Sequence, residues 1–366
     1  MSQPPPPRPA SYQDAGVQPS PGLGRMLDVL RGTFGNRRGI GEPLLDFGYY
    51  ANVLRITDTL GLAISTDGVG TKLLVAEMMG KYDTIGIDCI AMNANDIVCV
   101  GAEPIAMVDY VAVARLDEQV LREIAVGLEE GARQAGITIP GGELAQVPEM
   151  LRGPEGGDGG LDLVGTCVGT VELDRIITGA RIEPGDVVVG YASSGIHSNG
   201  LTLARKVLLD ERREWGVETH VAELGRCIGE ELLEPTRIYV RLALELLRRC
   251  DVRALMHITG DGFLNLRRVE AKVGFEIETL PAPPAVFRLV QEAGGIDVAE
   301  MYRVFNMGVG FCAVVPASDA DGALAAGREV RIEGWVLGRC VADEARTVRL
   351  RPPGLAGSSG GEFRPE

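Results

Sequence analysis

The sequence has few lysines and few histidines for a chain of 366 residues. Only four of its 36 basic residues are lysines, and only three residues are histidines. Arginine therefore supplies most of the positive charge, and it does so against a formal net charge of −15. Such an acidic chain has no general affinity for the phosphate backbone of nucleic acids or for an anionic lipid surface. We expect neither nucleic acid nor membrane as a partner.

Long apolar stretches and cysteine pairs are also missing. No segment reaches the ~18 continuous apolar residues of a membrane span. The amino-terminal MSQPPPPRPA has proline where a signal peptide needs an apolar core. The seven cysteines lie far apart and form no CxxC pair, so they predict buried thiols and neither a disulfide framework nor a zinc site. The cytoplasm is the expected compartment.

What the sequence does contain is a long alternation of strand and helix patterns. A chain of this length fits two domains of ~150 residues. One alternation starts at LGLAIST and ends at DLVGTCVGTVE, and a second begins at EPGDVVVGYASSG. We predict an α/β protein with domains at residues 25–173 and 174–351. The ends, 1–24 and 352–366, are rich in proline, glycine and serine and are predicted to be disordered tails.

The loop TDGVGTK, residues 66–72, is the first candidate site. Its glycines let backbone amides approach an anion, and Lys72 adds positive charge, which favours a phosphate cradle. The loop matches neither the P-loop GxxxxGK[ST] nor the dinucleotide fingerprint GxGxxG, and a plain strand-to-helix turn is the alternative. Asp67 would repel phosphate unless a cation lay between them. The loop therefore favours a phosphate site with a bound cation.

Two further segments place acids or amides next to apolar residues. Asn95 and Asp96 lie near the end of an apolar helical pattern, and Glu143 follows two glycines in PGGELAQVPEM. An unpaired buried polar group costs about 1 to 3 kcal/mol, so such groups need partners or ligands. Capping of a nearby backbone is the alternative for Asn95 and Asp96, and an ordinary glutamate in a turn is the alternative for Glu143. Asp88 and Asp109 are weaker candidates of the same kind.

Two of the histidines follow strand patterns. His197 lies in SSGIHSNGLTLARK, before a helix predicted to begin at Asn199, and His257 ends a strand in MHITGDGF. A helix N-terminus attracts anions, and an imidazole beside it can bind phosphate or transfer a proton. A structural role is the alternative for both. His220 lies in a polar segment and is predicted to be at the surface.

Taken in order, these motifs resemble those of the phosphoribosylformylglycinamidine cyclo-ligase family, also called aminoimidazole ribonucleotide synthetase. The resemblance covers about residues 11–348. DGVGTK and the Asn-Asp helix also occur, in weaker form, in the wider superfamily that includes thiamine-monophosphate kinase and selenophosphate synthetase. The segments that carry the resemblance are SYQDAGV, STDGVGTKLLVA, DTIGIDCIAMNANDIVCVGAEP, PGGELAQVPEM, SSGIHSNGLTLARK, LLEPTRIYV, HITGDGF and EMYRVFNMGVGF.

The resemblance implies a two-domain α/β fold and a homodimer whose N-terminal domains pair into a shared β-barrel. It implies ATP-dependent closure of formylglycinamidine ribonucleotide to aminoimidazole ribonucleotide, ADP and phosphate, a step of purine synthesis, in clefts between the domains. The alternatives are a small-molecule kinase of the same superfamily, similar to thiamine-monophosphate kinase, and a non-catalytic nucleotide-binding subunit.

The resemblance also implies roles for named residues. The catalytic residues would be His197, Asp67 and Lys72, and Mg²⁺ would be held by Asp67, Asp96, Glu143 and Asp261. A wider set would contact ATP and its phosphates: Gly68, Gly70, Thr71, Lys72, Asn95, Asp96, Gly141, Gly142, Glu143, Ser194, Asn199 and His257.

Two segments depart from the family pattern. Where the family commonly has a GGFG-like loop, this chain reads RRGIGEPLLDFGYY. Where many members have three consecutive glycines, it has Gly260, Asp261 and Gly262. An acid at this place is typical of the metal-binding acids of superfamily kinases, so Asp261 favours the kinase alternative.

Overall fold

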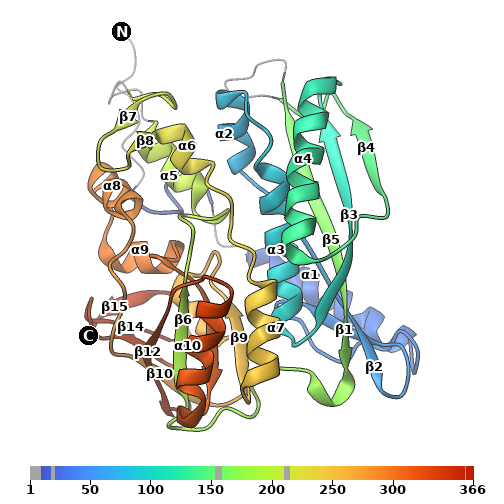
Figure 1. The fold of residues 1–366 in the computed structure, drawn as a ribbon, viewed down its shortest axis with the longest axis vertical. Coiled ribbons are helices and arrows are strands. Elements are labelled where there is room, and N and C mark those ends of the chain that lie inside the picture. Colours follow the sequence, from blue (N-terminus) through green and yellow to red (C-terminus); the bar gives the residue numbers. More distant parts are fainter. Residues whose placement is uncertain (1–9, 18–20, 153–158, 210–214, 359) are drawn as a thin grey trace.

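The structure of the chain, a computed structural model, is built from two α/β domains that lie side by side (Figure 1). It describes residues 10–17, 21–152, 159–209, 215–358 and 360–366. The N-terminal domain contains one five-stranded sheet. In spatial order its strands are β1 (Asn52–Arg55), β2 (Leu60–Gly68), β5 (Leu161–Glu172), β3 (Glu103–Val113) and β4 (Gly142–Gln146).

Helices cover one face of this sheet and leave the other more exposed. Helix α3 (Ile85–Cys99) packs on β2 and β5, and α4 (Glu118–Ala135) packs on α3. Burial alternates along β2, where Ala63 is fully buried and Leu62 and Ile64 on the opposite face are half-buried, as expected for a strand with two different faces. A Cβ at Gly169 of β5 would lie 2.5 Å from the Ile97 side chain, so this glycine allows α3 to approach the sheet closely.

The C-terminal domain is built on an eight-stranded sheet. The order is β15 (Phe363–Pro365), β14 (Leu355–Gly357), β13 (Val348–Leu350), β10 (Val273–Ile277), β12 (Gly334–Ala342), β6 (Val187–Ala192), β11 (Val309–Val315) and β9 (Ala254–His257). A short hairpin joins β7 (His220–Val221) to β8 (Arg226–Cys227), and His220 is exposed there, which confirms the prediction for this histidine.

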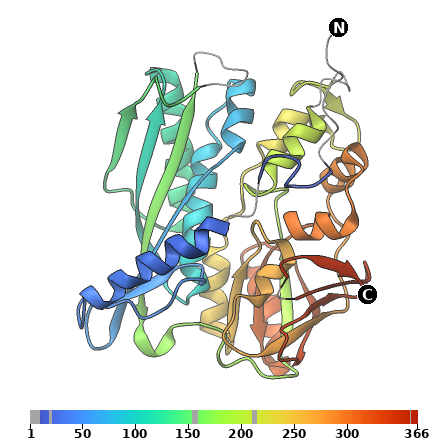
Figure 2. The same cartoon turned by 180° about the vertical axis from the view of Figure 1, so that it is seen from behind.

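The remaining helices flank these sheets. In the N-terminal domain they are α1 (Pro21–Arg31), seen in Figure 2 across the lower part of that domain, and α2 (Lys72–Met79). In the C-terminal domain they are α5 (Leu201–Leu208), α6 (Ile228–Leu232), α7 (Val240–Arg249), α8 (Ala285–Gly294), α9 (Val298–Val304) and α10 (Ala320–Glu329).

The two chain ends are ordered where the structure describes them, which corrects the prediction of disordered tails. Residues 355–357 and 363–365 extend the C-terminal sheet, and Leu355 and Phe363 are buried. Near the amino terminus, Ala15 is buried and the Tyr12 amide donates to Glu300. A few apolar side chains and a sheet edge thus order segments whose composition is typical of disorder. Residues 1–9 and 18–20 of the predicted tail lie outside the described residues.

Other expectations from composition can be compared directly with the fold. All seven cysteines are free, and six of them are buried, which confirms the prediction of buried thiols. No helix in the described ranges is both long and apolar enough to span a bilayer. The five-stranded sheet is open at β1 and β4, so the shared barrel, which needs a second chain, stays a prediction.

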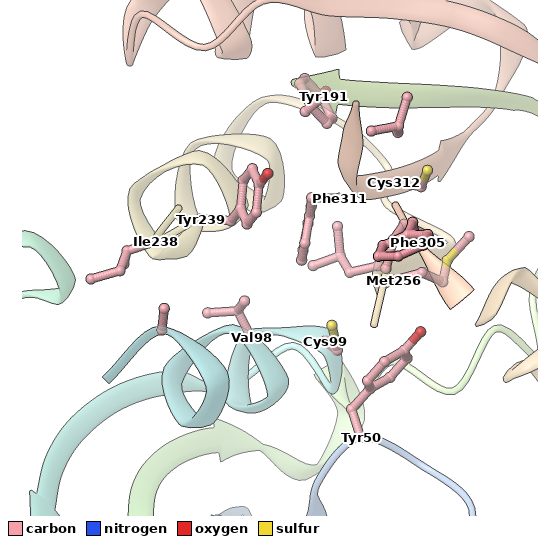
Figure 3. Close-up of a cluster of buried hydrophobic side chains, with 14 of the residues drawn as sticks. Tyr50, Val98, Cys99, Tyr191, Ile238, Tyr239, Met256, Phe305, Phe311 and Cys312 are labelled. Carbon is pink, nitrogen blue, oxygen red and sulfur yellow. The ribbon is translucent and has the colours of Figure 1, made fainter. Parts of the chain in front are cut away.

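The two domains meet through α3. Figure 3 shows Val98 and Cys99 of this helix, together with Tyr50, facing Tyr239, Phe311 and Met256 of the C-terminal domain. The rings of Tyr239 and Phe311 are stacked with their centroids 5.0 Å apart. Aromatic pairs of this kind add to the stabilisation from buried area. This apolar contact fixes the two domains relative to each other at the place where the polar motifs gather.

Candidate functional site

The polar residues of α3 contact the C-terminal domain. Asn95 and Asp96 follow Asp88 by seven and eight residues, and this spacing places all three side chains on one face of the helix. Each of them bonds to a group of the other domain: Asp88 to Thr236, Asn95 to the backbone at Arg237 and Tyr239, and Asp96 to His257. The helix therefore connects the predicted motifs of both domains.

Lys72 and Asp88 form a fully buried ion pair within this contact. The Lys72 Nζ lies 2.8 Å from the Asp88 Oδ1, and both side chains are 0% exposed. Nζ also donates to the Glu234 carbonyl. The same Asp88 oxygen accepts from the Thr236 amide at 2.7 Å and from the Thr236 hydroxyl at 2.6 Å. The ammonium of Lys72 is satisfied by the protein, so direct phosphate binding by this side chain requires the pair to open.

The rest of the TDGVGTK loop is more accessible. Gly70 is exposed with a φ of 72°, and no atom lies within 4 Å of the place where a Cβ would be. Thr71 reaches the C-terminal domain, since its hydroxyl lies 2.9 Å from that of Thr202. The Asp67 Oδ1 accepts from the Gly68 amide at 2.8 Å. Burial raises the pKa of the Asp67 carboxyl, and the nearby Asp96 carboxylate raises it further.

Asn95 and Asp96 are neighbours, but only one of the two side chains is free to contact a ligand. Asn95 uses both ends of its amide on the C-terminal domain, donating to the Arg237 carbonyl and accepting from the Tyr239 amide. Asp96 is 15% exposed, its Oδ1 lies 3.1 Å from the His257 Nδ1, and it lines a cavity of about 210 Å³ with residues 46–52 and 64–66. Asp96 can therefore reach a ligand, whereas Asn95 positions the two domains.

His197 is almost entirely enclosed. It is 2% exposed, its Nε2 accepts from the Ser194 amide at 3.3 Å, and its buried Nδ1 has no hydrogen-bond partner among the residues that the structure describes. Its φ of 69° is unusual for a residue with a side chain. Burial, followed by the proximity of His257, Lys72 and Arg237, holds its pKa well below the ordinary value. The imidazole is therefore neutral, and because Nε2 accepts a hydrogen bond, the ring hydrogen lies on Nδ1.

The loops around His197 and His257 lie against each other. A Cβ at Gly260 would lie 3.3 Å from the Asn199 side chain, and the Asn199 amide lies 4.0 Å from the Met92 sulfur of α3. Ser194 donates to the Pro235 carbonyl at 2.5 Å. The structure thus brings together most of the predicted residues at one interdomain site: Asp67, Gly68, Gly70, Thr71, Lys72, Asn95, Asp96, Ser194, His197, Asn199 and His257.

Comparisons with known proteins agree on the family. Residues 48–171 match a family model described as AIR synthase related protein, N-terminal domain, and residues 183–351 match the corresponding C-terminal domain. The phosphoribosylformylglycinamidine cyclo-ligase of Thermococcus kodakarensis is 52% identical over 318 residues, which are 86% of this chain and 90% of that protein. The chain belongs to the phosphoribosylformylglycinamidine cyclo-ligase family. A cyclo-ligase from Methanocaldococcus jannaschii is 44% identical over 90% of this chain and 92% of its own length.

Solved structures show that this cyclo-ligase family chain shares its fold with other proteins. A thiamine-monophosphate kinase from Stenotrophomonas maltophilia aligns with a TM-score of 0.58 at 18% identity, over 88% of this chain and 94% of that one. Hydrogenase maturation protein HypE in complex with ATP aligns with a TM-score of 0.57 at 19% identity, over 93% of both chains. Likeness at this level of identity establishes the two-domain α/β fold alone.

Four predicted residues lie outside the buried part of this site within one chain. Gly141, Gly142 and Glu143 are exposed at or beside the edge strand β4, and β5 and β3 separate that strand from Asp67 on β2. Asp261 is 62% exposed on its own loop and pairs with Arg268. In the described part of the chain, no three His, Cys, Asp or Glu side chains are grouped so that they could hold a metal. The predicted four-acid Mg²⁺ site is therefore not assembled within a single chain.

Sequence reasoning missed three groups that the structure adds to the site. Asn93 donates to the Asp67 carbonyl at 3.1 Å, Thr236 binds Asp88, and Arg268 lies with its guanidinium carbon 5.1 Å from the centre of the Tyr50 ring. Asn93 and Thr236 lie inside recognised motifs, MNANDI and LLEPTRIYV, but no spacing rule selects them. Arg268 follows the HITGDGF motif by a few residues, and that proximity is the only signal the sequence offers.

Proposed function

We propose that this chain closes the imidazole ring of aminoimidazole ribonucleotide from formylglycinamidine ribonucleotide, with ATP converted to ADP and phosphate. The observation that carries the proposal is the 52% identity to a curated cyclo-ligase over 86% of this chain. The kinase alternative rests on structural neighbours below 25% identity, which share the fold alone. The proposed reaction is a step of purine synthesis.

The chemistry needs one activation and one cyclisation. The formyl oxygen is a poor leaving group, so it first attacks the γ-phosphorus of ATP and ADP departs. The amidine nitrogen then bonds to the former formyl carbon, the carbon–oxygen bond breaks, phosphate leaves with that oxygen, and the nitrogen loses a proton. Phosphoryl transfer of this kind depends on positioning and charge neutralisation more than on a covalent residue of the enzyme.

The proton from the amidine nitrogen needs an acceptor in a protected place. A neutral imidazole accepts a proton only at the ring nitrogen that carries no hydrogen. In His197 this nitrogen is Nε2, which accepts from the Ser194 amide at 3.3 Å, so the substrate nitrogen would have to replace that amide before His197 could take its proton. His257, whose Nδ1 faces Asp96, would orient Asp96. We assign His197 the proton transfer, Gly68, Gly70 and Thr71 the phosphate contacts, and Lys72 a role in fixing the loop that makes these contacts.

ATP would be bound with Mg²⁺. A hard cation requires oxygen ligands, and Asp67 and Asp96 offer two carboxylates close enough for one to raise the pKa of the other. These groups fit the ion, with phosphate oxygens as further ligands. When bound, the ion would neutralise charge on the phosphates. Glu143 would join it only from a second chain, and Asp261 is not needed.

The more exposed face of the N-terminal sheet supports a homodimer. Ile105, Val108 and Tyr110 of β3 are 41 to 44% exposed on this face. Glu143 of β4 pairs in parallel with Tyr110, so its side chain shares that face. A contiguous exposed apolar face of this kind marks an interface.

We propose that two copies of the chain pair at this face. Light scattering should then give twice the chain mass. Val108→Asp should reduce the measured mass, whereas the control Val126→Asp on α4 should not.

We place the enzyme in the cytoplasm, because all seven cysteines are free thiols, as expected of a protein in a reducing compartment.

The test of the activity is incubation of the pure protein with ATP, Mg²⁺ and formylglycinamidine ribonucleotide. ADP release should depend on the ribonucleotide and be matched by aminoimidazole ribonucleotide, one for one. A parallel reaction with thiamine monophosphate should release no ADP. ADP formed with thiamine monophosphate and not with the ribonucleotide would replace the proposal with the kinase alternative.

A further inference from the structure

Two of the cationic side chains near the acids of the site, Lys72 and Arg268, have different surroundings. Lys72 and Asp88 are both 0% exposed and are surrounded by further hydrogen bonds. Arg268 is 35% exposed, and its Nη2 pairs at 2.9 Å with the Oδ2 of Asp261, which is 62% exposed. A ligand can replace a partner that faces solvent, whereas it cannot replace a buried one without opening the domain contact. Arg268 is thus the cation with an exchangeable partner.

Arg268 packs against Tyr50 of the N-terminal domain, which lines a cavity of that domain. Its guanidinium carbon lies 5.1 Å from the centre of the Tyr50 ring, and the Tyr50 hydroxyl contacts the Asn265 carbonyl at 3.4 Å. Tyr50 and Asp96 line the cavity of about 210 Å³. Burial lowers the pKa of Arg268, but Tyr50, Asp261 and Asp96 outweigh it and leave the pKa raised. The charge of Arg268 is therefore felt at Asp96, which lines that cavity.

We propose that Arg268 is the phosphate-binding cation of the interdomain site, and that Asp261 holds its guanidinium as a placeholder that a ligand phosphate displaces. The proposal rests on the proposed function for the identity of its ligands. The ligand chemistry is a phosphate group, from the ribonucleotide or from ATP. A guanidinium stacked on a ring is preorganised for two parallel hydrogen bonds to phosphate oxygens.

The exchange from Asp261 to phosphate is physically reasonable because exposed ion pairs contribute little stability. A phosphate carries more charge than a carboxylate and can accept two parallel hydrogen bonds from a guanidinium, whereas Asp261 accepts through Oδ2 from Nη2, so phosphate competes well for Arg268. The loop that carries Asp261 is held in place, since Gly262 has a φ of 53° and a Cβ there would lie 2.1 Å from the Tyr302 carbonyl oxygen. Asp261 therefore stays within reach of Arg268 when a ligand arrives.

The placeholder role and a metal-binding role for Asp261 predict opposite effects of one substitution. If Asp261 were a Mg²⁺ ligand, Asp261→Asn would weaken binding of Mg²⁺ with ATP. If it competes with phosphate for Arg268, the same change removes the competitor and one negative charge, and it tightens phosphate binding. The sign of the change separates the two roles without any need for catalysis.

The experiment is calorimetric titration of the full chain with three probes: formylglycinamidine ribonucleotide, a non-hydrolysable ATP analogue with Mg²⁺, and inorganic phosphate. We expect Arg268→Gln to weaken the binding of one nucleotide probe by about tenfold or more, since a charge-assisted bidentate contact is lost. Arg268→Lys should give an intermediate loss of affinity, and Asp261→Asn should increase the affinity for the same probe several-fold. The nucleotide probe that responds identifies the source of the phosphate.

A matched control removes a carboxylate elsewhere. Glu223 and Arg288 form a comparable exposed pair at 2.8 Å, and Glu223→Gln should change none of the affinities. Affinities of Arg268→Gln within twofold of wild type, or weaker binding to Asp261→Asn, would overturn the proposal. Because Asp261 is exposed, its variant should fold even if Arg268→Gln does not. If the wild type binds neither nucleotide, the proposed function fails, and the inorganic phosphate titration of the same variants decides the role of Arg268.

Discussion

The Lys72–Asp88 and Arg268–Asp261 pairs both belong to the interdomain region, but their burial is opposite. The first is enclosed and shares hydrogen bonds with Glu234 and Thr236, whereas the second is open to solvent on both sides. A buried pair is costly to break because it leaves an uncompensated charge, while an exposed pair contributes little. The comparison suggests that the enclosed pair holds the domains together and the open pair is available to ligands.

The largest effect is expected when the buried cation, Lys72, is removed. Lys72→Met should lower the free energy of unfolding by about 3 to 5 kcal/mol, because Asp88 would be left charged and buried. Urea unfolding followed by circular dichroism measures the loss. Lys81→Met, which removes a lysine paired with Asp83 at the surface, should cost no more than about 1 kcal/mol. A stable Lys72→Met protein that no longer binds phosphate would instead assign Lys72 a direct ligand contact.

The second prediction concerns the acids that face the cavity. Saturation with ATP and Mg²⁺ at about 100 times the dissociation constant should stabilise the fold by about 2.7 kcal/mol, and a chelator should remove this gain. Asp67→Asn should lose most of the gain. It should not lower the stability of the ligand-free protein, since the amide oxygen can still accept from Gly68 and the repulsion from Asp96 disappears. Thermal unfolding with and without ligand gives both numbers.

The metal assignment has its own control. Glu143→Gln should reduce the gain with ATP and Mg²⁺ only if Glu143 reaches the site from a second chain, so its effect should vanish in a monomeric variant such as Val108→Asp. Equal stabilisation by ATP with and without Mg²⁺ would show that Asp67 and Asp96 do not hold a cation.

The third prediction concerns the enclosed imidazole of His197, whose pKa burial lowers. The unfolded chain binds a proton at this histidine near pH 6.5 and the folded protein does not, so stability rises with pH in this range. The contribution of His197 should be complete above about pH 6.5 and should fall by up to about 1.4 kcal/mol per pH unit below it. His197→Gln should remove this part of the slope. The same substitution at the exposed His220, His220→Gln, is the matched control.

The fold and most of the site could be predicted from the sequence because strand and helix periodicities and ordered motifs are local. The gathering of Asp67, Asp96, His197 and His257 followed from the family resemblance. The burial of Lys72 could not be predicted, since it depends on residues 234–236 of the other domain. The ordered C-terminal end was also missed, because the burial of Leu355 and Phe363 depends on a sheet edge formed by distant residues.

The smallest expected effect concerns the exposed Arg268–Asp261 pair. Asp261→Asn should change the free energy of unfolding of the ligand-free protein by less than about 1 kcal/mol, since both partners of the pair reach solvent. Urea unfolding of this variant beside Lys72→Met, in the same buffer, gives the two values directly. Added salt should reduce the small effect of Asp261→Asn further, because ions screen exposed charges, and should leave the Lys72→Met effect nearly unchanged. A loss of several kcal/mol from Asp261→Asn would mean that this pair also holds the domains together, and Asp261 could then not act as a replaceable partner of Arg268.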